Sequence, residues 1–171
     1  MATANQCARR AGAGIVAVCA ALSLPMFGTF SQAAAADTTL TLFEHDTQQT
    51  NVDLGAPGRG PGDLFLFAGD VFDHAGGTKI GHTAGQCTTL SGDATNGDVF
   101  CQGTFDLEGG QIAIQGLTDS AALFGSGETG AVTIVGGTGI YANARGEGTI
   151  QVPPDVPNQT DANFVLHVVT G

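Results

Sequence analysis

The stretch AVTIVGGTGIYANARGEGTI, residues 131–150, decides between two folds. An apolar run, residues 132–135, leads into GTGIYA, residues 137–142, which has the G-x-G-x-x-A spacing of a dinucleotide-binding turn. Such a turn must open a helix whose N-terminus holds the pyrophosphate. The alternative is a connection between two strands, in which glycines allow backbone angles with positive φ.

The residues after this motif favour the connection between strands. Gly146 and Gly148 would fall in the second and third turns of the required helix, and each glycine costs a helix roughly 1 kcal/mol relative to alanine. Only 32 residues follow Gly139, too few for the remaining strands of a nucleotide-binding fold. We therefore expect Gly136, Gly137 and Gly139 to lie in a turn with positive φ.

The chain after residue 36 consists of short apolar segments separated by Gly, Asp and Asn, a pattern typical of strands and turns. No segment keeps a helical period for three turns. The predicted strands are residues 38–45, 63–72, 78–90, 98–107, 111–117, 131–135, 145–152 and 163–169. Eight short strands at even spacing predict an antiparallel sandwich or barrel.

The first 36 residues have the features of a secretory signal peptide. Arg9 and Arg10 form a basic head, residues 11–30 are apolar and uncharged, and residues 31–36 contain the A-x-A spacing of a cleavage site. The alternative is a membrane anchor, because a run of about 20 residues is long enough to span a bilayer. We expect cleavage near Ala36, secretion to the extracellular space, and one domain over residues 37–171.

The charge of the remaining chain limits its partners. All 16 acidic residues follow residue 36, together with three basic residues, Arg59, Lys79 and Arg145. Such a chain repels a phosphate backbone. We therefore expect no nucleic acid partner, and no membrane partner once the leader is removed.

Two cysteines, Cys87 and Cys101, remain after the leader is removed. Asn96-Gly97 between them favours a tight turn, and a hairpin over this segment places Cys87 opposite Cys101. An even pair in an exported chain predicts a disulfide. The alternative, two free thiols that bind a metal, lacks a further Cys or His at suitable spacing. We expect no metal.

Several stretches, in chain order, resemble two related families. LFEHD (42–46) and IVGGTGIYANARGEGTI (134–150) resemble plant dirigent proteins, whereas GDLFLFAGDVF (62–72), IGHTAGQC (80–87) and GQIAIQG (110–116) resemble allene oxide cyclases. The two families share an eight-stranded antiparallel barrel that is often assembled as a trimer. The resemblance implies that residues 37–171 form an all-β fold, an eight-stranded antiparallel β-barrel, and suggests a homotrimer.

Both families act on reactive small molecules inside an apolar barrel, where a pocket fixes one conformer and excludes water. The cyclases close a ring in an unstable fatty-acid epoxide, and dirigent proteins hold phenoxy radicals or quinone methides. The resemblance implies a barrel that binds an apolar or phenolic small molecule and guides its cyclisation or stereoselective coupling, with no cofactor. The alternative is a small-molecule-binding or structural barrel without chemistry.

The resemblance also suggests site residues. The positions of the cyclase Glu and Asn are occupied by Thr41 and Gly69, so both of those catalytic groups are missing, and the cyclase cysteine that lines the cavity is Cys87. The dirigent stretches align Asp46 as a general acid and Arg145 as a group that stabilises developing negative charge. For both, a surface role is the alternative. The predicted substrate-binding residues are Thr41, Phe43, Phe65, Phe67, Gly69 and Tyr141.

Overall fold

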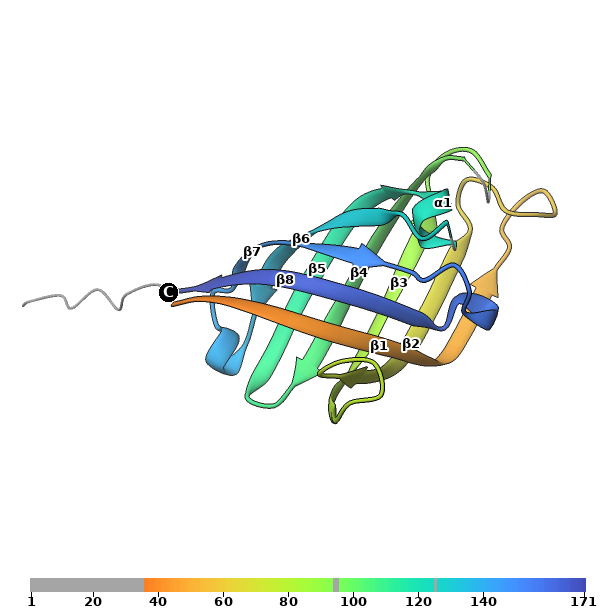
Figure 1. The fold of residues 1–171 in the computed structure, drawn as a ribbon. Helices are drawn as coiled ribbons and strands as arrows, with labels where there is room; N and C mark the ends of the chain where they lie inside the picture. The colour runs from red at the N-terminus through yellow and green to blue at the C-terminus, as the bar shows by residue number, and fades with distance from the viewer. Residues whose placement is uncertain (1–35, 94–95, 125) are drawn as a thin grey trace, which may run out of the picture. The chain divides into compact units, whose positions relative to one another are not determined.

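The computed structural model describes residues 36–93, 96–124 and 126–171, so the predicted signal peptide lies almost entirely outside the described residues (Figure 1). The described strands are β1 (Ala36–Val52), β2 (Leu64–Phe72), β3 (Lys79–Thr89), β4 (Asp98–Leu107), β5 (Gly110–Asp119), β6 (Thr129–Gly137), β7 (Arg145–Gln151) and β8 (Asp161–Thr170). Each strand pairs antiparallel with its neighbours in sequence, and β1 pairs with β8 to close the ring. The predicted eight-stranded antiparallel β-barrel is confirmed.

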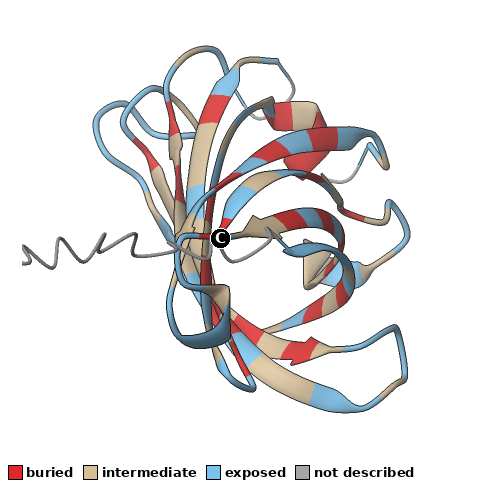
Figure 2. Ribbon diagram, turned by 90° about the vertical axis from the view of Figure 1, so that its left-hand side faces the viewer, coloured by how far each residue is buried: buried red, intermediate tan, exposed pale blue. Residues whose placement is uncertain are grey.

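Buried and exposed residues alternate along most strands, as Figure 2 shows, because successive side chains point to opposite faces of a sheet. On β1, Leu42 and Glu44 are buried, whereas Thr41 and His45 are exposed. The inward side chains form the core of the barrel. Its most buried members include Val71, Phe105, Ile112, Leu166 and Val168.

The two ends of the barrel differ in what covers them. At one end lie the start of β1, the end of β8 and a short 3-10 helix, η1 (Gly139–Tyr141), whose Tyr141 packs against the core. At the other end lie a one-turn helix, α1 (Ser120–Leu123), a second 3-10 helix, η2 (Pro157–Gln159), and the loop of residues 53–63 (Figure 1). Within the described residues, no helix is long and apolar enough to cross a membrane.

The stretch of residues 131–150 forms β6, η1 and β7. No long helix follows the G-x-G-x-x-A match, so the predicted connection between strands is confirmed. Gly139 has a φ of +61°, as expected, but Gly136 and Gly137 lie in β6 without positive φ, which corrects that part of the prediction. Gly137 instead permits a close approach, because a Cβ there would lie 2.4 Å from the carbonyl oxygen of Tyr141.

β1 continues well beyond the predicted strand of residues 38–45. A bulge between Asp46 and Gln48 shifts the register, after which Val52 still pairs with Leu64 at the start of β2. A bulge adds a residue to one strand and bends it locally. The polar sequence after Asp46 carries no apolar alternation, so the extension was not predictable from hydrophobic pattern.

Cys87 of β3 lies directly opposite Cys101 of β4, and the two are joined by a disulfide. The predicted pairing is therefore present in the structure. Both residues line the interior of the barrel, and Cys87 is only 5% exposed. The disulfide therefore forms part of the inner wall.

Candidate functional site

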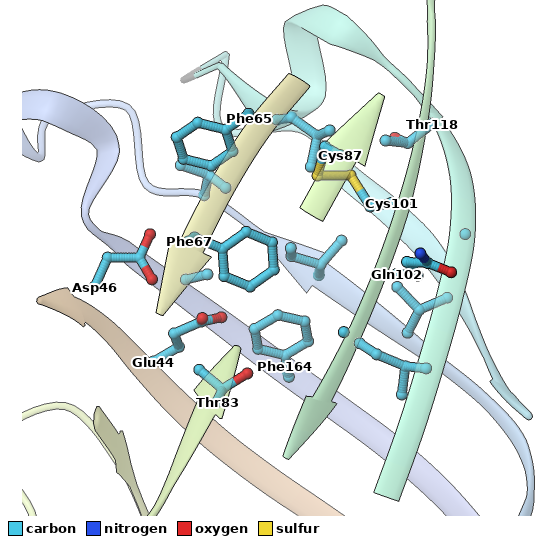
Figure 3. A pocket seen from close by; sticks show the side chains of 18 of the residues that line it. Glu44, Asp46, Phe65, Phe67, Thr83, Cys87, Cys101, Gln102, Thr118 and Phe164 are labelled. Carbon is cyan, nitrogen blue, oxygen red and sulfur yellow. A yellow bond between two sulfur atoms is a disulfide. The ribbon is translucent and has the colours of Figure 1, made fainter. Parts of the chain in front are cut away.

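A cavity of about 80 Å³ lies inside the barrel, on the side of α1 and η2. Most of its wall is apolar, and the Cys87–Cys101 disulfide forms part of it (Figure 3). The aromatic and aliphatic lining residues are Phe65, Phe67, Phe105, Ile114, Leu123, Phe124, Val132, Ile150, Val152 and Phe164. A concave apolar site with few polar groups suits an apolar small molecule.

The position of Phe67 in the wall depends on a glycine of the neighbouring strand β3. A Cβ at Gly85 of β3 would lie 2.5 Å from Cζ of Phe67, and a Cβ at Gly103 of β4 would lie 3.5 Å from the same atom. Gly85 therefore leaves the space that the aromatic ring occupies. This local arrangement sets the shape of the cavity on that side.

Two carboxyl groups enter the cavity from β1. Glu44 is 4% exposed, and both Glu44 and Asp46 line the cavity, on the same side of it in Figure 3. Among the described residues, Oε1 of Glu44 and Oδ1 of Asp46 are buried and have no hydrogen-bond partner. The other oxygen of Asp46, Oδ2, accepts a hydrogen bond of 2.9 Å from the side-chain amide of Gln49. Buried polar atoms normally have partners, so a proton held between the two carboxyl groups, or a ligand, would complete the hydrogen bonds of these oxygens.

The two carboxyl groups influence each other's protonation. Burial raises the pKa of Glu44 well above its usual value, and the charge of Asp46 and hydrogen bonding with its carboxyl group raise it further. Burial also raises the pKa of Asp46, against the opposing effect of the hydrogen bonds from Gln49 and Glu44. Because two adjacent carboxylates in a mainly apolar wall repel each other, we assign one proton to Glu44, the buried member of the pair, and the negative charge to the partly buried Asp46. The pair thus places a proton donor beside a proton acceptor.

The loop before β8 fixes the position of Asp46. The backbone N–H of Asp46 donates a 2.7 Å hydrogen bond to the carbonyl oxygen of Thr160. Next to it, Asp161 lines the cavity and lies 2.7 Å from Nδ1 of the half-exposed His45. The bulge in β1 is therefore held against the start of β8 at the rim of the cavity.

Five of the predicted site residues line this cavity: Asp46, Phe65, Phe67 and the two disulfide cysteines, Cys87 and Cys101. Thr41 and Phe43 do not, and their expected position in the cavity is wrong. Thr41 is exposed, and the ring of Phe43 packs against Phe72 at 6.2 Å between centroids. The reason is the two-residue period of a strand, which turns Thr41 and Phe43 outward when their neighbours point inward.

The remaining predicted residues lie elsewhere. Gly69 is buried opposite Asp46, outside the cavity wall, where a Cβ would lie 2.4 Å from the carbonyl oxygen of His45. Tyr141 packs against the core at the opposite end of the barrel, and Arg145 is exposed there at the start of β7. Tyr141 and Arg145 therefore do not line the cavity that contains Asp46.

Sequence reasoning missed Glu44, although the pattern contained it. Leu42, Glu44 and Asp46 alternate with outward residues, so the period that buries Leu42 also buries Glu44. A glutamate is rarely buried without a partner, which makes this position a candidate for function. In the described part of the chain, no cluster of three or more His, Cys, Asp or Glu residues is arranged to hold a metal.

The protein is thus a closed eight-stranded barrel, and its mainly apolar cavity, which contains the buried Glu44 and the partly buried Asp46, is a candidate small-molecule site. Residues 43–166 match the family described as allene oxide cyclase barrel like domain, and the chain belongs to that family. A comparison with curated proteins found no match.

Solved structures share the fold. One is a pyocyanin demethylase, 28% identical, with a TM-score of 0.63 over 77% of this chain and 99% of that chain. A second is the Diels Alderase AbmU from Streptomyces koyangensis, 21% identical, with a TM-score of 0.62 over 80% of this chain and 68% of that chain. A third is the pterocarpan synthase dirigent protein GePTS1, 17% identical, with a TM-score of 0.61 over 82% of this chain and 98% of that chain.

Proposed function

We propose that the barrel binds an apolar small molecule in its cavity and guides the cyclisation or stereoselective coupling of that molecule. The observation that carries the proposal is the Glu44–Asp46 pair, which places two unpartnered buried oxygens in an otherwise mainly apolar wall. The barrels of similar fold include a Diels Alderase and a dirigent protein, which supports this class of reaction. Export from the cell, suggested by residues 1–36, is part of the proposal.

The pair can support a redox-neutral ring closure. Glu44 would donate its proton to a carbonyl or quinone-methide oxygen, while an O–H or N–H group of the same molecule adds to the electron-poor carbon. Asp46 would accept the proton released by that group, and return of this proton to Glu44 would restore the starting state. A positioned acid and base contribute typically 10²–10⁴-fold to the rate, and the apolar wall keeps water from the reacting atoms. This step needs neither an oxidant nor a cofactor.

The similarity to the pyocyanin demethylase supports a planar aromatic ligand of about the size of pyocyanin. Phe65 and Phe67 lie 5.9 Å apart between ring centroids, with an interplanar angle of 26°, and both line the cavity. Aromatic side chains of this kind offer flat apolar surface to an aromatic ligand. Pyocyanin itself is therefore a suitable first probe.

The size of the cavity favours a second candidate function. About 80 Å³ is below the roughly 300–1,000 Å³ of usual ligand pockets, so a ligand of two or more rings requires side chains to move. If the side chains that line the cavity do not move, a ligand of two or more rings does not fit. The protein would then be a structural barrel, or a barrel that binds a smaller molecule without catalysing a reaction.

The experiment that separates these functions uses the source organism's small-molecule extract and product analysis by mass spectrometry. We expect a product with the wild-type protein, and a decrease of about 10²-fold or more in Glu44→Gln and Asp46→Asn. Glu147→Gln is the matched control, because Glu147 is an exposed carboxylate on β7. Equal product formation in all four proteins would exclude catalysis by the pair and favour the barrel without chemistry.

A homotrimer also belongs to the proposal. The outer wall exposes Leu117, Val135 and Val165, at 58%, 50% and 37%, on strands β5, β6 and β8. Exposed apolar side chains are compatible with an interface between copies. Light scattering coupled to size exclusion tests this state, and a monomeric mass at micromolar concentration would contradict it.

A further inference from the structure

A second cavity, of about 190 Å³, lies at the mouth of the barrel beneath the loop of residues 53–63. It shares Phe65, Cys87 and Phe124 with the inner cavity, so these residues stand between the two spaces. The rings of Phe65 and Phe124 meet edge to face, with centroids 6.3 Å apart. A movement of Phe124 would therefore join the mouth cavity to the inner cavity.

Among the residues that the structure describes, Arg59 of the loop is the only Lys or Arg whose side chain lines either cavity. Its guanidinium lies over the ring of Phe124, with Cζ 3.5 Å from the centroid. One of its nitrogens, Nη1, is buried and has no hydrogen-bond partner among the described residues. The other, Nη2, donates to the side-chain oxygen of Asn51 over 3.4 Å, a long hydrogen bond.

Asp53 and Asp63 of the same loop also line the second cavity. Both are engaged by backbone groups and form no salt bridge with Arg59 in the described structure, although the charge of Asp63 opposes the lowering of the Arg59 pKa by burial. Asp63 accepts hydrogen bonds from the N–H groups of Leu54 and Gly60, at 2.7 and 2.8 Å. Asp53 accepts one from the N–H of Gly58 at 3.0 Å. A partly buried guanidinium with an unpartnered N–H is costly unless an anion or another acceptor completes its hydrogen bonds.

We propose that Arg59 binds the anionic oxygen of an amphipathic organic ligand, a carboxylate, sulfonate or phenolate, at the mouth of the barrel. The apolar part of this ligand then extends past Phe124 toward the inner cavity and its carboxyl pair. This assignment rests on the proposed function, because it names the substrate class of the same site. The guanidinium suits the role, since its planar fork of donors matches oxyanions and its face stacks on an aromatic ring.

Two fluorescent probes of the same skeleton test the proposal. 8-Anilinonaphthalene-1-sulfonate carries a sulfonate, and N-phenyl-1-naphthylamine is the same molecule without it. We expect the wild-type protein to bind both and to prefer the sulfonate, although the described chain is strongly acidic overall. Arg59→Gln should weaken binding of the sulfonate by about tenfold or more and leave binding of the neutral probe within about twofold.

Lys79→Gln is the control for charge, since Lys79 is exposed and pairs with Asp70. It should leave binding of both probes unchanged.

Arg59→Lys, with circular dichroism to confirm folding, should give intermediate affinity for the sulfonate, because the charge remains but the planar fork is lost. Binding of the neutral probe with no selective loss of the sulfonate in Arg59→Gln would overturn this assignment alone. Failure of the wild-type protein to bind either probe would overturn the proposed ligand-binding function as well.

Discussion

Glu44 and Asp46 lie two residues apart on β1, and their carboxyl groups enter the same, mainly apolar cavity. Each has one buried oxygen without a partner in the described structure. The free energy of unfolding should therefore depend on pH, because the carboxyl pair binds its proton more tightly in the folded protein than in the unfolded chain.

Stability should therefore fall as pH rises. Below the ordinary Glu pKa of 4.5, Glu44 is protonated in both states and imposes no penalty. Above it, the unfolded chain releases the proton while the folded protein retains it, so the free energy of unfolding decreases until the raised pKa is passed. Each unit by which the pKa is raised corresponds to about 1.4 kcal/mol.

Urea unfolding of wild type and Glu44→Gln between pH 4 and 9 measures this effect. The stability of the variant relative to wild type should increase with pH, because glutamine does not ionise. The exposed Glu147→Gln should parallel wild type. A constant difference between Glu44→Gln and wild type across this range would contradict the assignment of the proton to Glu44.

Loss of the Cys87–Cys101 disulfide should destabilise the barrel by roughly 3 kcal/mol, because the bridge closes a loop with a sequence separation of 14. Thermal unfolding of wild type and of the double variant Cys87→Ser, Cys101→Ser measures the loss. Alkylation of the unfolded, unreduced protein followed by mass measurement checks the bond itself. Two modified thiols after removal of the leader would show that the pair is not joined.

A methyl group at Gly85 should disturb the cavity. In Gly85→Ala the new Cβ would lie 2.5 Å from both the ring of Phe67 and the carbonyl oxygen of Gln102. We expect a loss of about 1–3 kcal/mol in the free energy of unfolding and weaker binding of N-phenyl-1-naphthylamine. Gly136→Ala is the control, because nothing lies within 4 Å of its Cβ position. Equal behaviour of the two variants would contradict the packing of Phe67 against Gly85.

Export should remove the first 36 residues. Protein recovered outside the cells of the source organism should begin at or near Asp37, as measured by intact mass and N-terminal sequencing. The small residues before Asp37 are the reason for this expectation. Full-length protein found only in the membrane fraction would favour the membrane anchor instead.

The sequence by itself determined the class of fold and the covalent link. Strand-length apolar segments separated by turn residues placed all eight strands, and a turn-forming Asn-Gly between two cysteines placed Cys87 opposite Cys101. These features depend on neighbours in sequence, since the period of a strand and the chemistry of a turn are local properties. For the same reason the glycines after Gly139 were sufficient to exclude a nucleotide-binding helix.

The tertiary structure alone decided which side chains share a cavity. Alignment of short motifs placed Thr41 inside and did not identify Glu44, because an error of one residue reverses every side chain of a strand. It also joined Arg145 to Asp46, although the closed barrel holds them at opposite ends. The contact of Arg59 with the ring of Phe124 joins two segments that are far apart in the sequence, and such long-range contacts leave no periodic pattern in it.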